Sequence, residues 1–219
     1  MIKGWWWKSL SCVLLIYAVI AGFLIPMPDT LIGDSMRAVF YHVGMWFGMF
    51  VLLTLSFAYS LRYLRKFDAK EDLAAVEAAN TGLLFGILGI LTGMIWAKYT
   101  WGQFWTRDPK LDGAAAGIFI YLAYAILRAS VPDPQKRAKV SAVYNILAYA
   151  LWIVFVLILP RTTAGTLHPG QDGLPVMSLG LSPATRMVFY PAMAGWILLG
   201  LWIMELRTRI RKTEHLTTK

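Results

Sequence analysis

This sequence has little charge. Only 15% of its 219 residues are Asp, Glu, Lys or Arg, whereas an average soluble domain contains roughly 25%. Hydrophobic residues make up 58% of the chain, and no polar stretch is long enough to form a separate soluble domain. These absences exclude an ordinary soluble globule, and we expect one membrane domain over residues 1–219.

Cysteine and histidine are also scarce. The single Cys12 excludes an internal disulfide and a cysteine metal site, and its place within an apolar run predicts that its sulfur packs in the core. Only three histidines occur, at positions 42, 168 and 215. Any site that depends on imidazoles must therefore use a small set of residues, and we expect His215, in the basic tail, to be solvated.

Six apolar stretches are long enough to cross a hydrocarbon core of about 30 Å, which takes on the order of 20 helical residues. They cover approximately residues 9–26, 38–62, 73–98, 113–129, 139–160 and 184–206. The predicted fold class is an all-α integral membrane protein, a bundle of six transmembrane helices. No small-residue cleavage site follows the first stretch, so we expect it to be a retained signal anchor.

The basic residues are unevenly distributed between the two sets of loops. The N-terminus, residues 62–70 and 128–139, and the tail from residue 207 hold fifteen Lys and Arg. Together with the acids in the adjoining parts of the apolar stretches, this side of the chain has seven acids and a net charge of +8. The opposite set holds six Lys and Arg and five acids, a net charge of +1. The positive-inside rule then predicts cytoplasmic termini and three outward-facing loops, at 27–37, 99–112 and 161–183. The net charge of +9 is thus explained by the membrane, and we expect no nucleic-acid partner.

The third apolar stretch carries two packing signals. Gly82, Gly86, Gly89 and Gly93 place small residues along one side of a helix, which lets a neighbouring backbone approach closely. Glu77 is an acid within this stretch, one to two turns from its cytoplasmic end, and we expect a snorkelling or partner-facing carboxylate rather than a proton relay.

Two of the three histidines fall on the predicted outer side. His42 stands at the start of the second stretch, on one helical stripe with Met45, Trp46 and Met49. His168 lies in the third outer loop, before Pro169-Gly170. Each alone is compatible with an ordinary helix-end or loop histidine. Two neutral imidazoles, one on each face of a porphyrin, would give a six-coordinate haem.

The outer loop at 99–112 is rich in tryptophan. Trp101 and Trp105 are four residues apart, so in a short helix they lie on one face, and Pro109 predicts that such a helix ends at about Arg107 or Asp108. A tryptophan belt at the membrane interface explains part of this loop. Flat aromatic faces also suit a macrocycle, and Arg37, Lys98, Arg107 or Lys110 are candidates to pair with its propionates. From the residues alone, both interpretations stay open.

The order of these residues resembles a known signature. Trp96-Ala97-Lys98, followed by Trp101-Gly102-x-x-Trp105-x-x-Asp108-x-Lys110-Leu111, is similar to the tryptophan-rich segment of the haem-handling proteins of cytochrome c biogenesis. With the six-helix plan, Tyr41-His42-Val43 and Thr166-Leu167-His168-x-Gly170, the chain looks most like the haem-delivery family known as cytochrome c maturation protein C. The resemblance covers about residues 5–208.

The resemblance implies a site and a set of partners. His42 and His168 would be the axial ligands of the iron of haem b, and the platform beside the porphyrin would consist of Trp101, Gly102, Trp105, Asp108 and Leu111. The implied partners are a small single-span subunit, an ATP-binding cassette complex with its permease, and a membrane-tethered haem chaperone. Two residues depart from the pattern, since Arg107 stands where the family commonly has Trp, and Lys110 where it has Arg, which loses the bidentate fork.

We therefore expect an inner-membrane protein that binds haem at its outer face and delivers it for c-type cytochrome assembly, and that is not itself an enzyme. Arg37, Arg107 and Lys110 are secondary candidates for the propionates. The first alternative is a haem channel and cytochrome synthase of the related biogenesis system. Another is a b-type cytochrome subunit, which would need histidine pairs at two depths of the membrane. A third is a permease subunit without a chromophore.

Overall fold

The computed structural model describes residues 4–27, 33–163, 165–168 and 181–217. Of residues 215–217 it describes the backbone only. Within these ranges all of the regular secondary structure is helical. The elements are α1 (Trp6–Leu24), the 3-10 helix η1 (Asp34–Phe40), α2 (His42–Lys66), α3 (Ala69–Trp101), α4 (Pro109–Ser130), α5 (Pro134–Ile153), the π-helical η2 (Val154–Ile158), α6 (Leu159–Thr162) and α7 (Pro183–Thr217).

Six helical segments are long and apolar enough to cross a membrane, which confirms the predicted number. The fifth segment is continuous from α5 through η2 to α6, over residues 134–162. Most of the helices extend beyond their apolar stretches because polar residues cap them. For example, α3 begins at Ala69 because the Asp68 side chain accepts a hydrogen bond from the Lys70 backbone N–H, and Glu71 and Asp72 lie in its first turn.

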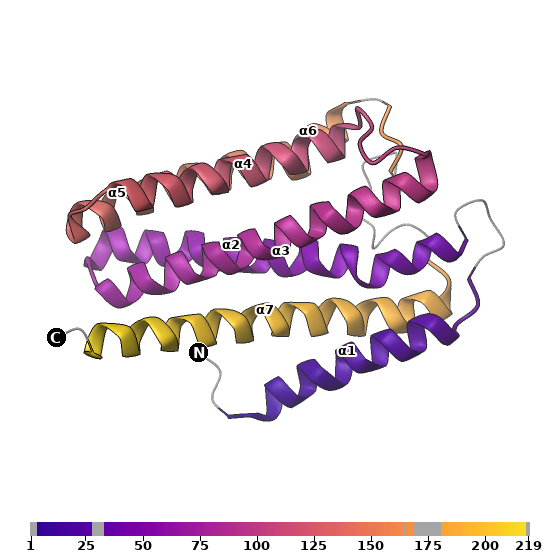
Figure 1. Ribbon diagram of the computed structural model, residues 1–219, viewed down its shortest axis with the longest axis horizontal. Helices are drawn as coiled ribbons and strands as arrows, with labels where there is room; N and C mark the ends of the chain where they lie inside the picture. Colours follow the sequence, from indigo (N-terminus) through magenta and orange to yellow (C-terminus); the bar gives the residue numbers. More distant parts are fainter. Residues whose placement is uncertain (1–3, 28–32, 164, 169–180, 218–219) are drawn as a thin grey trace.

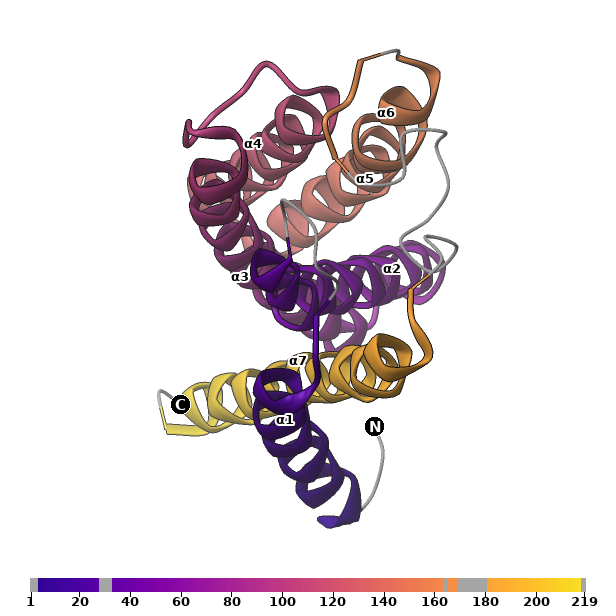
Figure 2. The ribbon, with the colours of Figure 1, turned by 90° about the vertical axis from the view of Figure 1, so that its right-hand side faces the viewer.

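The helices form three layers (Figures 1 and 2). α2 and α3 lie in the middle, α4 to α6 cover one side of them, and α7 with α1 covers the other. Buried side chains of the middle layer, including Met49, Leu52 and Phe85, form the main core with Tyr121 and Trp152 of the α4–α5 layer. The long elements run nearly parallel to one another in Figure 1, as in a transmembrane bundle.

The sequence predicted that the glycines of α3 lie against a neighbouring helix, and in the structure α2 packs on them. A Cβ atom at Gly82 would lie 2.8 Å from Leu53, and one at Gly89 would lie 2.9 Å from Trp46. At Gly93 the nearest atom is Cε1 of His42, at 2.7 Å. The close packing of α2 on α3 therefore reaches from the middle of the bundle to the first predicted site residue.

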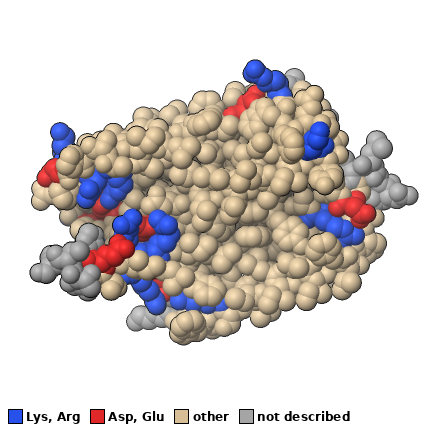
Figure 3. All heavy atoms as spheres, in the orientation of Figure 1, with Lys and Arg blue, Asp and Glu red and all other residues tan. Residues whose placement is uncertain are grey.

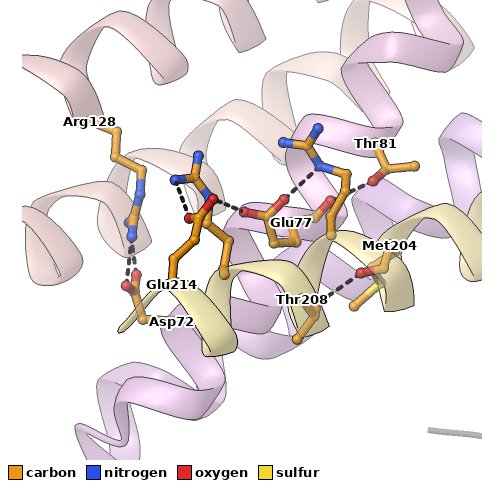
Figure 4. A network of polar contacts seen from close by, with 9 residues as sticks. Asp72, Glu77, Thr81, Arg128, Met204, Thr208 and Glu214 are labelled. Carbon is orange, nitrogen blue, oxygen red and sulfur yellow. Dashed lines mark hydrogen bonds and ion pairs between the residues drawn. The ribbon is translucent and has the colours of Figure 1, made fainter. Parts of the chain in front are cut away.

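Charged side chains gather at the two ends of the bundle, with an uncharged band between them (Figure 3). At the end opposite His42, Glu77 is buried and pairs with Arg207 at 2.6 Å and Arg211 at 3.5 Å. Asp72 accepts two hydrogen bonds from Arg128, at 2.8 and 2.6 Å (Figure 4). The Glu77 carboxylate thus faces partners, as expected, and ties α3 to α7.

The prediction for Cys12 is wrong. Cys12 is exposed on α1 rather than packed in the core. The physical reason is the position of α1, which packs mainly against α7 and leaves apolar residues such as Val13 and Ile16 exposed. In a bilayer these faces would contact lipid tails, where a thiol is as well tolerated as another small apolar group.

The π-helical segment η2 ends two residues before Pro160. Proline has no N–H and its ring crowds the carbonyl four residues earlier, so an uninterrupted α-helix cannot pass through it without strain. Gly113 of α4 lies against this segment, and a Cβ there would lie 2.1 Å from the backbone oxygen of Phe155. The contact of α4 with η2 thus requires a residue without a side chain.

We expect Gly113→Ala to separate α4 from η2 and to lower the free energy of unfolding by about 1–3 kcal/mol, the usual cost of overpacking. Thermal unfolding of the purified protein in detergent measures this. Gly200→Ala is a matched control, because a Cβ there would meet only the tip of Leu52 at 2.9 Å and the edge of Phe85. Equal unfolding temperatures for the two variants would show that α4 can move away from η2 without a loss of stability.

Candidate functional site

A cavity of about 300 Å³ lies at the end of the bundle that carries His42 and His168, which we call the histidine end. Its volume is at the lower limit of typical ligand pockets. Both imidazoles line it, and its walls come from η1, α2, α3, α4, η2 and α6. Two histidines 126 positions apart in the sequence thus share one cavity, and most of its other lining side chains are apolar or aromatic.

His42 is held by a hydrogen bond to α3. Its Nδ1 lies 3.1 Å from Oγ1 of Thr92. The Thr92 hydroxyl also lies 2.8 Å from the backbone oxygen of Leu88 and 3.1 Å from that of Gly89, either of which can accept its proton. With the hydroxyl proton donated to one of these oxygens, Thr92 accepts from Nδ1–H of His42, and in that tautomer Nε2 keeps the lone pair that a metal ion requires.

His168 is held by a carboxylate. Its Nδ1 lies 2.9 Å from Oδ1 of Asp108, and because an ionised carboxylate only accepts hydrogen bonds, Nδ1–H is the donor. Asp108 also accepts hydrogen bonds from the Thr166 hydroxyl at 3.0 Å and from the backbone N–H groups of Leu167 at 2.6 Å and Lys110 at 2.8 Å. One buried carboxylate therefore fixes the His168 loop, caps α4, and leaves Nε2 of His168 with its lone pair.

The pKa values at this contact have opposing causes. Burial alone raises the pKa of Asp108, but the charge of His168 and the hydrogen bonds from Leu167, Lys110 and Thr166 outweigh burial, so the pKa lies below its ordinary value of 3.8. Burial lowers the pKa of His168 and outweighs the Asp108 carboxylate, which raises it, so the net pKa lies below 6.5. At neutral pH the carboxylate is charged and the imidazole is neutral.

The tryptophans surround His168 rather than forming one continuous face. The Trp101 ring lies edge-on to the imidazole at 4.9 Å between centroids, and Trp96 lies 6.1 Å from it and lines the cavity. Trp105 instead donates a hydrogen bond to Asp112 at 3.0 Å and does not line the cavity. Leu111 is buried and lines the cavity.

The predicted short helix over Trp101 to Arg107 is wrong. α3 ends at Trp101 because Gly102 adopts a left-handed conformation with φ of 77°, which glycine accommodates without a steric penalty. Pro109 does not end a helix but occupies the first turn of α4, after the Asp108 cap. Trp105 and Arg107 lie in the irregular segment between the two helices.

The four cations predicted as candidates for the propionates do not lie together at the cavity. Of them, Lys110 lines the cavity. Arg37 instead donates hydrogen bonds to the backbone oxygens of Gly22 and Ile25 and pairs with Asp34, so it connects η1 to the end of α1. Arg107 is exposed and does not line the cavity, and Lys98 donates to the backbone oxygen of Gly102 at 2.9 Å.

Sequence reasoning missed several residues of this site. Arg161 lines the cavity beside Lys110, and Thr92 orients His42. Trp96 was part of the signature but not of the predicted site, whereas Met45 and Met49, on the predicted stripe with His42, are core residues. His42 and Trp46 are one helical turn apart, and this spacing was the signal that could have predicted that α2 contributes both side chains to the cavity lining. Pro169 and Gly170 lie outside the described residues.

Known proteins are similar to this sequence over nearly its whole length. A model of the family described as Heme exporter protein C matches residues 2–215. The chain belongs to this family. Its six spans and its bacterial relatives make it a multi-pass protein of the inner membrane, and membership implies haem handling in cytochrome c biogenesis as a transport component.

Individual relatives show how far the similarity extends. The Heme exporter protein C of Paracoccus denitrificans is 28% identical over 194 residues, covering 86% of this chain and 77% of the relative. That of Bradyrhizobium diazoefficiens is 32% identical over 142 residues, 64% of this chain and 53% of the relative. Cytochrome c biogenesis protein CcsA of Pelargonium hortorum is 31% identical over 106 residues, 48% of this chain and 33% of that protein.

We expect Asp108→Asn to release the His168 loop. The amide has one acceptor oxygen and one donor nitrogen, so it cannot accept all four hydrogen bonds that the carboxylate accepts. Amide hydrogen exchange at Leu167 should accelerate about tenfold, equivalent to about 1.4 kcal/mol. Asp112→Asn is the control, since its amide oxygen can still accept from Trp105. Unchanged exchange at Leu167 in Asp108→Asn would mean that the backbone alone orders this loop.

The same loop should respond to pH in two steps. Both pKa values are lowered, so each group stabilises the loop above its ordinary pKa and this stabilisation is lost as the pH falls. We expect protection of the Leu167 amide, corrected for the intrinsic exchange rate, to stay constant from pH 8 to 6.5. It should weaken below 6.5 as His168 gains a proton, and again below 3.8 as Asp108 does.

A His168→Gln variant separates the two groups. It should lose the step below pH 6.5. In the wild-type protein, protection of the Leu167 amide could instead increase as the pH falls from 6.5. That result would show that the Asp108 carboxylate raises the pKa of His168 by more than burial lowers it.

Proposed function

We propose that this chain binds haem b between His42 and His168 and delivers it to a haem chaperone for the assembly of c-type cytochromes. The observation that carries the proposal is the state of the two imidazoles. Both line one cavity, and the Nδ1 atom of each lies within hydrogen-bond distance of an oxygen atom, of Thr92 or of Asp108, so that Nε2 is the nitrogen left for a metal ion. A neutral histidine with its proton on Nδ1 is suited to axial ligation of iron.

The surroundings support a porphyrin between these ligands. Trp46, Trp96 and Leu111 line the cavity, and Trp101 packs against His168. With both axial positions filled by histidine, haem is carried without an open site for oxygen chemistry. The protein would then act by positioning and tuning the iron, and the vinyl groups would react only on a partner.

The histidine end faces outward in this proposal, and both termini are cytoplasmic. The support is the charge distribution, a net of +8 at the opposite loops and tail against +1 at the histidine end. We assign the remaining partners by family: a membrane-tethered haem chaperone, an ATP-binding cassette with its permease, and a small single-span subunit. Release to the chaperone requires at least one histidine to leave the iron.

A haem channel and cytochrome synthase is the second candidate, favoured by the similarity to CcsA over about half of this chain. Such a protein would need further histidines within the membrane, and this sequence has only His215 besides the proposed ligands. His215 belongs to the last turns of α7, at the opposite end of the bundle. The same count argues against a b-type cytochrome subunit with two haems.

We expect the purified protein, reconstituted with haem, to give the low-spin spectrum of a bis-histidine complex. His42→Ala and His168→Ala should each convert it to a high-spin, five-coordinate form, because one axial ligand is lost. Added imidazole should restore the low-spin spectrum, and His215→Ala should leave it unchanged. A low-spin spectrum that survives either cavity substitution would remove that histidine from the ligand set.

A further inference from the structure

The charged side chains among the described residues that line the cavity are Lys110 and Arg161, both cations. Lys110, in the first turn of α4, and Arg161, in the last turn of α6, line it, and none of its described lining residues is Asp or Glu. α4 and α6 pack against each other, and the two cations are close enough to interact electrostatically. The cavity therefore has a basic edge formed by two helix ends.

The wall formed by η1 and α2 is apolar. Met36, Val39 and Val43 line it, together with Leu181 from the start of the last span. η1 packs against α1, α2, α3 and α7, whereas α6 packs against α4 and η2, so the basic edge and the apolar wall belong to different sides of the cavity. A flat ligand in this cavity would have one edge beside two cations and another beside aliphatic side chains.

We propose that Arg161, with Lys110, binds the two propionate carboxylates of haem, and that the porphyrin lies with its propionate edge toward α4 and α6 and an apolar edge toward η1. The inference rests on the proposed haem function and deepens it. A guanidinium presents a planar pair of N–H donors that matches a carboxylate, and an ammonium supplies a second point charge. Two cations on one edge match the two acidic groups that porphyrin carries on one edge.

The η2 segment explains how Arg161 reaches this place. A π turn holds one residue more than an α turn, so residues after it are rotated by about 100° relative to an uninterrupted helix. Val156 and Leu157 within η2, and Pro160 after it, also line the cavity. The irregular turn and the proline thus belong to the wall that presents Arg161.

The test compares haem with its dimethyl ester, which has the same ring and vinyl groups but no propionate charge. The full-length protein in detergent is titrated with each porphyrin, and the low-spin Soret band reports binding. We expect wild-type protein to bind haem more tightly than the ester. Arg161→Gln should weaken haem binding about threefold to tenfold, a range limited by solvent screening at this exposed residue, and should leave ester binding unchanged.

Three further variants sharpen the comparison. Arg161→Lys should fall between wild type and Arg161→Gln, because it keeps the charge but not the planar fork. Lys110→Gln combined with Arg161→Gln should remove the preference for haem over the ester. Arg186→Gln is the matched control, since it removes one exposed arginine from the first turn of α7, outside the cavity lining.

The outcomes separate this inference from the function on which it rests. If Arg161→Gln weakens haem and ester equally, or weakens neither, the propionate assignment is overturned while the low-spin spectrum still supports haem ligation. If wild-type protein gives no low-spin spectrum with either porphyrin, the haem function and the propionate assignment both fail.

Discussion

The Asp108 carboxylate connects the start of α4 to the loop that carries His168. It accepts four hydrogen bonds while only 1% exposed, and a buried carboxylate survives in such a place only when its acceptor capacity is filled. Each donor depends on the others, because the loss of one leaves a buried charge less well solvated. The α4 cap, the loop and the tautomer of His168 are therefore one cooperative unit.

The other cavity histidine, His42, is positioned by close packing instead of charge. Gly89 and Gly93 of α3 bring α2 close enough for Trp46 and His42 to lie over the glycine positions, and Thr92 on the same turn supplies the acceptor. Small residues at a membrane helix interface ordinarily serve association alone. Here they also set the distance between an imidazole and the helix that orients it.

Much of this arrangement could be predicted from the sequence. The six apolar stretches predicted the spans, and the glycines of α3 predicted a close helix contact without identifying α2 as the partner, because local hydrophobicity and spacing do not specify which helices are neighbours. The shared cavity of His42 and His168 was suggested by resemblance. The tautomers were not predictable, since they depend on acceptors 50 and 60 positions away. Arg161 was missed for a different reason. It was assigned to the outer loop at 161–183, whereas it belongs to α6, and the π turn before it changes which face of the helix it occupies.

The two proposed ligands differ in how they can be moved. His42 belongs to the first turn of a 25-residue helix packed in the middle layer, so its displacement requires movement of the bundle. His168 sits on a short non-helical segment that, among the described residues, is attached through Asp108 and the rings of Trp96 and Trp101. Segments held by few contacts open locally at far lower free energy than core helices. Exchange of axial ligands would therefore be sequential and one-sided, with the loop ligand dissociating first and the helix ligand holding the iron while a partner takes the vacated face.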